Sequence, residues 1–131
     1  MVVKTFKETI ICIVIIVVIF SLDIFTQKYT KNTTNEITEI FSELKQLALR
    51  EDKEQMEKEI VKLDDEWNKK HDKLAYYIEH DELEKVDTAI VSAKSYIETE
   101  DYPSALAELD VGKFVLEHIQ RKYEFNLVNI F

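Results

Sequence analysis

The beginning of the chain is far more apolar than the rest. Eleven apolar residues follow one another from Ile10 to Phe20, and no charged residue occurs between Glu8 and Asp23. A helix needs about 20 residues to cross the roughly 30 Å hydrocarbon core of a bilayer. A helical span over residues 6–25 has this length and places both acidic residues near an interface, where a charge costs less than at the centre. Residues 1–27 therefore predict a single transmembrane anchor.

Two other interpretations of this segment are possible. A cleaved signal peptide has a similar charged start and apolar stretch. However, Phe20, Ser21, Leu22 and Asp23 do not provide the small residues of a cleavage site. A buried β-strand would suit the many β-branched residues, but the rest of the sequence offers no partner strand. An uncleaved anchor in the lipid bilayer is the interpretation we adopt.

Residues 28–34 are polar and predict a linker, which becomes part of one long rod if it is helical. Thr33 and Glu36 have the spacing of a capping box and predict that a new helix begins there. The residues that follow recur at helical spacing and predict one apolar face. These residues are Ile37, Ile40, Phe41, Leu44, Leu47 and Ala48.

Residues 50–53 form a charged patch that suits either a turn or a helix surface. Two apolar series follow this patch and predict two more helices. The first series is Met56, Ile60, Leu63, Trp67, His71, Leu74 and Ile78. The second series is Leu83, Val86, Ile90, Ala93 and Ile97. The step from Ile78 to Leu83 is out of phase on a 3.6-residue helix, which predicts a break at residues 80–82 with Asp81 as a helix cap.

Residues 100–103 mark the clearest boundary. Asp101 can cap a helix, and Pro103 then falls in the first turn, where its missing N–H costs nothing. Gly112 interrupts the apolar stripe of this helix and predicts a close approach to another helix. We expect the apolar tail, residues 125–131, to fold back and cover one end of the bundle. The stripe is Ala105, Leu109, Gly112, Leu116, Ile119 and Tyr123.

The predicted fold class is all-α. An N-terminal transmembrane helix precedes an antiparallel up-and-down bundle of three to four helices, formed by residues 35–131. Short connections favour this arrangement because they place successive helices antiparallel.

Composition narrows the function further. The 131 residues include one Gly and one Pro and carry a formal net charge of −9. This charge argues against nucleic acid as a partner, and the scarcity of Gly argues against glycine-loop nucleotide folds. Cys12 is the single cysteine, so no intrachain disulfide can form. Lys4 and Lys7 precede the span, which predicts a cytoplasmic N-terminus and an extracytoplasmic C-terminal domain on the cell membrane.

Candidate chemistry is sparse. His71, His80 and His118 do not have the spacing of a metal-binding pair, and we expect them to be boundary or helix-end residues. The acidic clusters at residues 64–66 and 79–84 lack the pattern of a calcium loop and predict solvated helix faces. Trp67, Tyr76, Tyr77 and Tyr96 predict core or boundary positions. No catalytic, cofactor-binding or metal-binding residue is predicted, and no cofactor.

Several short segments in the second half of the chain follow one another in a characteristic order. They are residues 80–83 (HDEL), 96–98 (YIE), 101–106 (DYPSAL), 114–119 (FVLEHI) and 129–131 (NIF). With the apolar N-terminus, this order resembles an uncharacterised family of small membrane-anchored helical proteins from Clostridium-type Gram-positive bacteria, defined as a domain of unknown function. The resemblance implies an anchor and a helical domain, and it implies no catalytic residue.

The sequence thus predicts a non-enzymatic, single-pass protein of the cell envelope. Its acidic helical domain would act through contacts, either with a membrane-protein partner or with a second copy of itself. The alternative is an extracytoplasmic bundle that senses a ligand or an ion.

Overall fold

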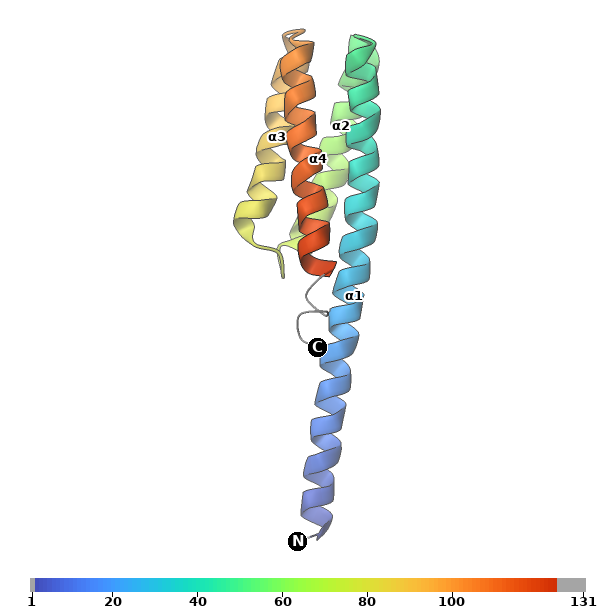
Figure 1. Cartoon of the computed structure of the whole chain (residues 1–131), viewed down its shortest axis with the longest axis vertical. Helices are drawn as coiled ribbons and strands as arrows, with labels where there is room; N and C mark the ends of the chain where they lie inside the picture. Colours follow the sequence, from blue (N-terminus) through green and yellow to red (C-terminus); the bar gives the residue numbers. More distant parts are fainter. Residues whose placement is uncertain (1, 125–131) are drawn as a thin grey trace.

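Four helices account for nearly all of residues 2–124, the part of the chain that the computed structural model describes. They are α1 (Val2–Leu49), α2 (Lys53–Leu74), α3 (His80–Glu98) and α4 (Tyr102–Glu124). No strand occurs among the described residues. The all-α prediction is therefore confirmed, with four helices that run alternately up and down (Figure 1). The tail prediction falls on residues 125–131, outside the described range.

Each helix packs against its neighbours in the sequence, and α4 returns to pack against α1. Among residues 2–124, the backbones of the diagonal helices are not in contact, neither those of α1 and α3 nor those of α2 and α4. The bundle is therefore a ring of four helices around one core. This is the arrangement that short connections between antiparallel helices favour.

The helix α1 has two halves with different surroundings. Its 48 residues span about 72 Å at 1.5 Å per residue. The first half projects from the bundle as an isolated helix, and the second half is one of the four packed helices (Figure 1). Residues 28–34 therefore belong to the continuous rod.

The predicted helix start at Thr33 is wrong, because threonines in this segment bond along the helix. The hydroxyl of Thr30 donates to the carbonyl of Thr26 at 2.7 Å, and that of Thr34 donates to the carbonyl of Thr30 at 2.8 Å. Such bonds to the preceding turn let threonine continue a helix. Thr30, Thr33 and Thr34 are buried, so the bundle already includes them.

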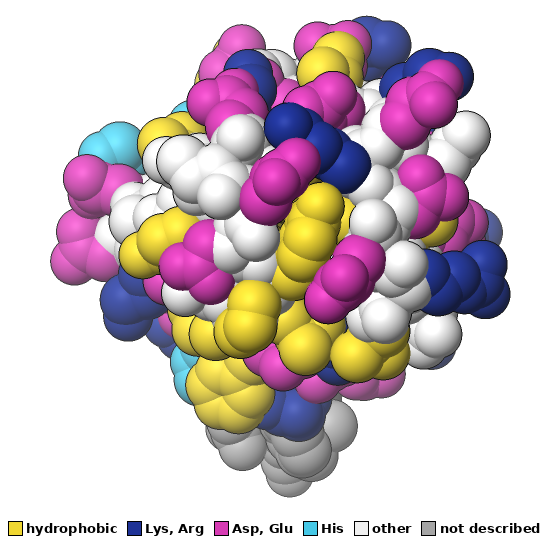
Figure 2. All heavy atoms as spheres, turned by 90° about the horizontal axis from the view of Figure 1, so that it is seen from above, with side chains coloured by type: hydrophobic (Ala, Val, Ile, Leu, Met, Phe, Trp, Pro, Cys, Tyr) yellow, Lys and Arg dark blue, Asp and Glu magenta, His cyan; other side chains and the backbone are white. Residues whose placement is uncertain are grey.

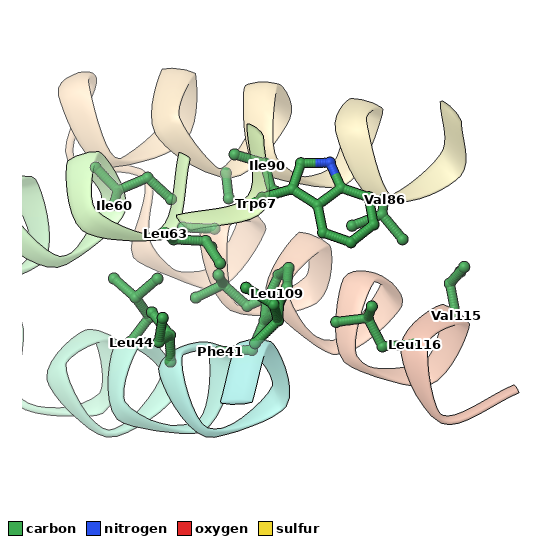
Figure 3. Close-up of a cluster of buried hydrophobic side chains, with 14 of the residues drawn as sticks. Phe41, Leu44, Ile60, Leu63, Trp67, Val86, Ile90, Leu109, Val115 and Leu116 are labelled. Carbon is green, nitrogen blue, oxygen red and sulfur yellow. The ribbon is translucent and has the colours of Figure 1, made fainter. Parts of the chain in front are cut away.

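The predicted apolar stripes form the core. Trp67 and Phe41 are the largest fully buried side chains, and they lie among aliphatic residues from all four helices (Figure 3). The stripes are confirmed with small exceptions, since Leu47, His71 and Tyr123 are half-buried. The labelled core residues besides these two aromatics are Leu44, Ile60, Leu63, Val86, Ile90, Leu109, Val115 and Leu116.

Gly112 marks the close approach that its place in the stripe predicted. A Cβ atom there would lie 2.5 Å from Cε1 of Phe41 and 3.2 Å from Cβ of Ala89. The missing side chain therefore lets α4 approach α1 and α3 at the same level. Packing at this crossing outweighs the weak helix propensity of glycine.

We call the end of the bundle farthest from the N-terminus the distal end. Its two turns have the same backbone conformation. Glu51 and Glu100 adopt left-handed conformations with φ of 55° and 60°. In each turn the N–H of the following aspartate, Asp52 or Asp101, bonds back across the helix end in a Schellman arrangement. Each aspartate then caps the next helix through its side chain. The charged patch at residues 50–53 is thus a turn, and the predicted Asp101 cap is confirmed.

The turn at the other end of the bundle, the proximal end, is built differently. The helix α2 ends at Leu74, and α3 begins at His80 after a turn that buries Ile78. The predicted cap at Asp81 is wrong, because Glu79 holds the N-cap position and makes no side-chain capping bond. The path of this turn is therefore fixed by the buried side chain of Ile78 and not by a side-chain cap.

Candidate functional site

The first half of α1 has a strongly apolar and solvent-exposed surface. An 18-residue window in this helix has a mean hydropathy of 2.8, and none of it is buried by the rest of the chain. Ile10, Ile15 and Ile19 are all about half exposed, and Cys12 is exposed among them. A core helix of a soluble domain would be mostly buried, whereas a membrane anchor and a secretory signal both share this pattern.

Polar side chains gather where α1 enters the bundle. We call Thr30, Thr34, Tyr77, Gln120 and Tyr123 the collar. The hydroxyls of Thr30 and Tyr77 share a hydrogen bond of 2.6 Å, and Thr34 donates to Oε1 of Gln120 at 3.2 Å. The Tyr123 hydroxyl donates to the carbonyl of Tyr77 at 3.1 Å. The collar therefore joins α1, the α2–α3 turn and the last turns of α4.

The two tyrosines of the collar are partly buried. Burial raises the pKa of Tyr77, and the hydrogen bond with Thr30 offsets only part of this effect. Burial also raises the pKa of Tyr123. The two rings meet edge to face, with centroids 5.9 Å apart, a favourable geometry for aromatic pairs. Both hydroxyls thus remain hydrogen-bond donors throughout the physiological pH range.

An ion cluster lies beside the collar and corrects one prediction. Glu82 was expected on a solvated acidic face, but it is only 7% exposed. Nζ of Lys122 lies 3.1 Å from Glu79 and 3.3 Å from Glu82, and hydrogen bonds to these carboxylates raise the pKa of Lys122. His118 lies 3.6 Å from Glu82. The Lys122 ammonium from α4 compensates the charge of this buried carboxylate.

A second polar group lies between α2 and α3. The indole N–H of Trp67 donates to Oδ1 of Asp87, and the ring of His71 meets the indole edge at 5.8 Å. Nε2 of His71 is 3.4 Å from Oδ2 of Asp87 but makes no hydrogen bond. His71 is half-buried beside the core, and its contacts position the single tryptophan against α3.

The remaining candidate residues are not brought together. His80 is exposed and lies 3.9 Å from Glu84, while Tyr76 is 90% exposed, so the core or boundary prediction for Tyr76 is wrong. Tyr96 is half-buried, as expected for a boundary position. Among residues 2–124 no group of three histidine, cysteine or carboxylate side chains is placed to hold a metal ion.

The comparison with protein families identifies the bundle. A family model described as a domain of unknown function, DUF4363, matches residues 24–130. The chain belongs to the DUF4363 family. No curated protein and no solved structure matches it. The DUF4363 region begins at Ile24, close to the point where α1 reaches the bundle, so the collar lies inside the family domain and most of the exposed apolar helix precedes it.

Sequence reasoning missed the collar. Thr30 lies in the segment predicted as a linker, and the polar character of that segment hid its burial. A signal was nevertheless available, because Thr26, Thr30, Thr33 and Thr34 recur at helical spacing. Glu82 gave no such signal, because its cations come from α4, about 40 residues later in the chain.

Proposed function

We propose that this chain is a non-enzymatic, single-pass membrane protein of a Gram-positive cell envelope of the Clostridium type. Residues 6–25 cross the bilayer, and the acidic bundle acts through protein contacts in an accessory or structural role. The observation that carries the proposal is the exposed apolar half of α1, which continues without a break into the core of the bundle.

Continuity of α1 supports retention of the segment. Signal peptides end at a small-residue cleavage site, and the chain has Phe20, Ser21 and Leu22 near the end of its apolar run. The helix also continues through this stretch into buried positions at Thr30 and Thr33. One rod thus carries the anchor and one quarter of the bundle, so the bundle's position is fixed relative to the membrane.

Contacts are the proposed mode of action because the surface offers an acidic groove and exposed apolar side chains. A groove of about 470 Å³ lies between α3 and α4, with Ala89 and Val115 among its apolar lining and Asp81, Glu84 and Glu108 among its carboxylates. On α4, Val111 and Phe114 are 49% and 62% exposed. From the distal end, many acidic side chains are visible, with hydrophobic and basic ones between them (Figure 2). Such a surface suits a protein partner with complementary basic groups.

Sidedness tests the membrane arrangement. In a Cys12→Ser background, a single cysteine is introduced at exposed Ser95 in one variant and at Val3 in another. A membrane-impermeant maleimide added to intact cells should label the Ser95→Cys chain at once and the Val3→Cys chain only after permeabilisation. The reverse labelling pattern would contradict the proposed orientation.

Photo-crosslinking from native membranes tests the contact function. A benzophenone amino acid replaces Phe114 in one variant and Lys94, an exposed position on α3, in the control. The Phe114 variant should give a discrete adduct that the Lys94 variant lacks, and mass spectrometry of the adduct identifies a partner or a second copy. Equal, diffuse adducts from both variants would leave the contact surface without support.

A further inference from the structure

A hollow of about 290 Å³ lies against the collar, between α1 and the end of α4. Ile24, Lys28 and Lys31 line it from α1, and Gln120, Tyr123 and Glu124 line it from α4. The α1 positions are spaced by four and three residues, which places these three side chains on one face of the helix. The hollow thus has an aliphatic lower edge and a basic upper part.

The two lysines have no counter-ion within residues 2–124. Among the described residues, neither Lys28 nor Lys31 makes an ion pair, whereas Lys122 nearby is held by Glu79 and Glu82. Gln120 accepts from Thr34 through Oε1, which leaves its amide nitrogen as a donor. Among the described lining residues Glu124 is the one carboxylate, so the charged groups that line the hollow there carry a net positive charge on an acidic protein.

The depth of the hollow matches one layer of the membrane. If the hydrocarbon core ends near Phe25, Lys28 and Lys31 lie about 4.5 and 9 Å beyond it along the helix. The headgroup region extends roughly 5–7 Å on each side of the hydrocarbon core. Lys28 therefore lies within the headgroup layer, Lys31 lies at its outer boundary with a side chain long enough to reach a phosphate, and Ile24 lies at the level of the first acyl carbons.

We propose that this hollow binds the phosphodiester headgroup of an anionic phospholipid, such as phosphatidylglycerol. Lys28 and Lys31 pair with the phosphate, the Gln120 amide donates to a phosphate or glycerol oxygen, and Ile24 contacts the upper acyl chain. The inference rests on the proposed membrane anchor and adds a specific lipid contact to it. A bound lipid would fix the rotation of α1 and, through the collar, the orientation of the bundle.

Native mass spectrometry of the full-length chain tests the site. Protein is released from nanodiscs that contain equal amounts of phosphatidylglycerol and phosphatidylcholine, and the lipids retained on the protein are counted. We expect at least one retained phosphatidylglycerol, several-fold in excess over phosphatidylcholine. A Lys28→Gln/Lys31→Gln variant should retain about 25-fold less phosphatidylglycerol, because each lysine near an anionic surface contributes roughly fivefold.

Matched controls separate the possible outcomes. Lys58→Gln/Lys94→Gln removes two charges nearer the distal end and should retain phosphatidylglycerol like the unmodified chain. Equal losses in both double variants would show a general charge effect and overturn the site. Displacement of the lipid by millimolar inorganic phosphate would assign the hollow to free phosphate instead. Incorporation into nanodiscs without lipid preference would overturn this inference alone, whereas failure to incorporate would overturn the anchor.

Discussion

The two ends of the bundle are stabilised in different ways. At the distal end, both turns use a left-handed glutamate followed by a capping aspartate, and Lys53 joins them through an ion pair with Glu100 at 3.2 Å. At the proximal end, the turn before α3 has no side-chain cap, and the collar and the Glu82 cluster hold it. Local sequence therefore determines the distal end, while long-range contacts to α1 determine the proximal end.

The difference has a functional meaning. Contacts of the proximal end depend on where α1 lies, so a displacement of the exposed half of α1 reaches the α2–α3 turn through Thr30 and Tyr77. The distal end has no such link, since its turns form within a few residues. The comparison predicts that collar mutations affect both stability and membrane orientation, while distal mutations affect stability alone.

The largest expected effect lies between the two ends, at Gly112. Gly112→Ala forces a Cβ against the ring of Phe41 and should lower the free energy of unfolding by about 2 kcal/mol, despite the better helix propensity of alanine. Chemical denaturation of the detergent-solubilised full chain measures the loss. Ser95→Ala, an exposed change on α3, should stay within about 0.5 kcal/mol. If Gly112→Ala no longer lowers the free energy of unfolding in a Phe41→Leu background, the clash with the Phe41 ring is the cause of the loss.

A smaller effect is expected when tyrosine hydroxyls are removed at the two ends. Tyr77→Phe breaks the hydrogen bond with Thr30 and should cost about 1 kcal/mol of unfolding free energy. Tyr96 is half-buried near the distal end, and its hydroxyl makes no hydrogen bond among the described residues, so Tyr96→Phe should cost less than about 0.5 kcal/mol. Equal losses in the two variants would remove the distinction between the ends.

Glycine at the distal turn should stabilise the protein. Glu51→Gly relieves a left-handed conformation that is unfavourable for residues with a Cβ, and it should raise the unfolding free energy by about 0.5–1 kcal/mol. Glu39→Gly, at an exposed position inside α1, should lower it by about 1 kcal/mol. Opposite signs for the same substitution would confirm that backbone conformation decides the effect, and matching signs would contradict it.

A pH effect is expected where Glu59 of α2 faces Glu43 of α1. Burial raises the pKa of Glu59, and Glu43 adds to the rise while Lys62 opposes it. The folded state therefore binds a proton more readily than the unfolded state, so acidification from neutral pH adds stability until pH falls below the unfolded pKa. Denaturation experiments at several pH values should show this gain of stability on acidification in the unmodified chain and not in the Glu59→Gln variant. An identical pH dependence in both chains would exclude Glu59 as its source.

The smallest effect is expected from divalent cations, which test the sensing alternative. The acidic residues of α3 near the proximal end are either exposed or paired with α4, as Glu82 is. Millimolar calcium or magnesium should therefore leave the Tm within about 1 °C. A rise of several degrees that disappears with a chelator would favour an ion-sensing role.

The sequence was sufficient for the parts of the fold that depend on periodicity. Four apolar stripes gave four helices, and Gly112 and Asp101 were placed correctly because a close approach and a cap have local signatures. The caps expected at Thr33 and Asp81 were wrong, because burial of Thr33 and Ile78 overrode local preference. Glycine is the usual marker of a left-handed helix end, and glutamates occupy both such positions here.

The candidate site was less predictable for a physical reason. The collar and the Glu82 cluster depend on contacts between residues more than 35 positions apart, such as Thr30 with Tyr77 and Lys122 with Glu82. Residue spacing along one helix carries no information about such pairs. The apolar half of α1, in contrast, was evident from the run of apolar residues in the sequence.

The most direct test of the account is the fate of residues 1–25 in the mature protein. Membranes from cells expressing the full chain are washed with alkaline carbonate, and the intact mass of the protein in each fraction is measured. The account predicts a carbonate-resistant protein whose mass includes the entire N-terminal segment. A protein released into the soluble fraction, or one whose mass lacks that segment, would contradict it.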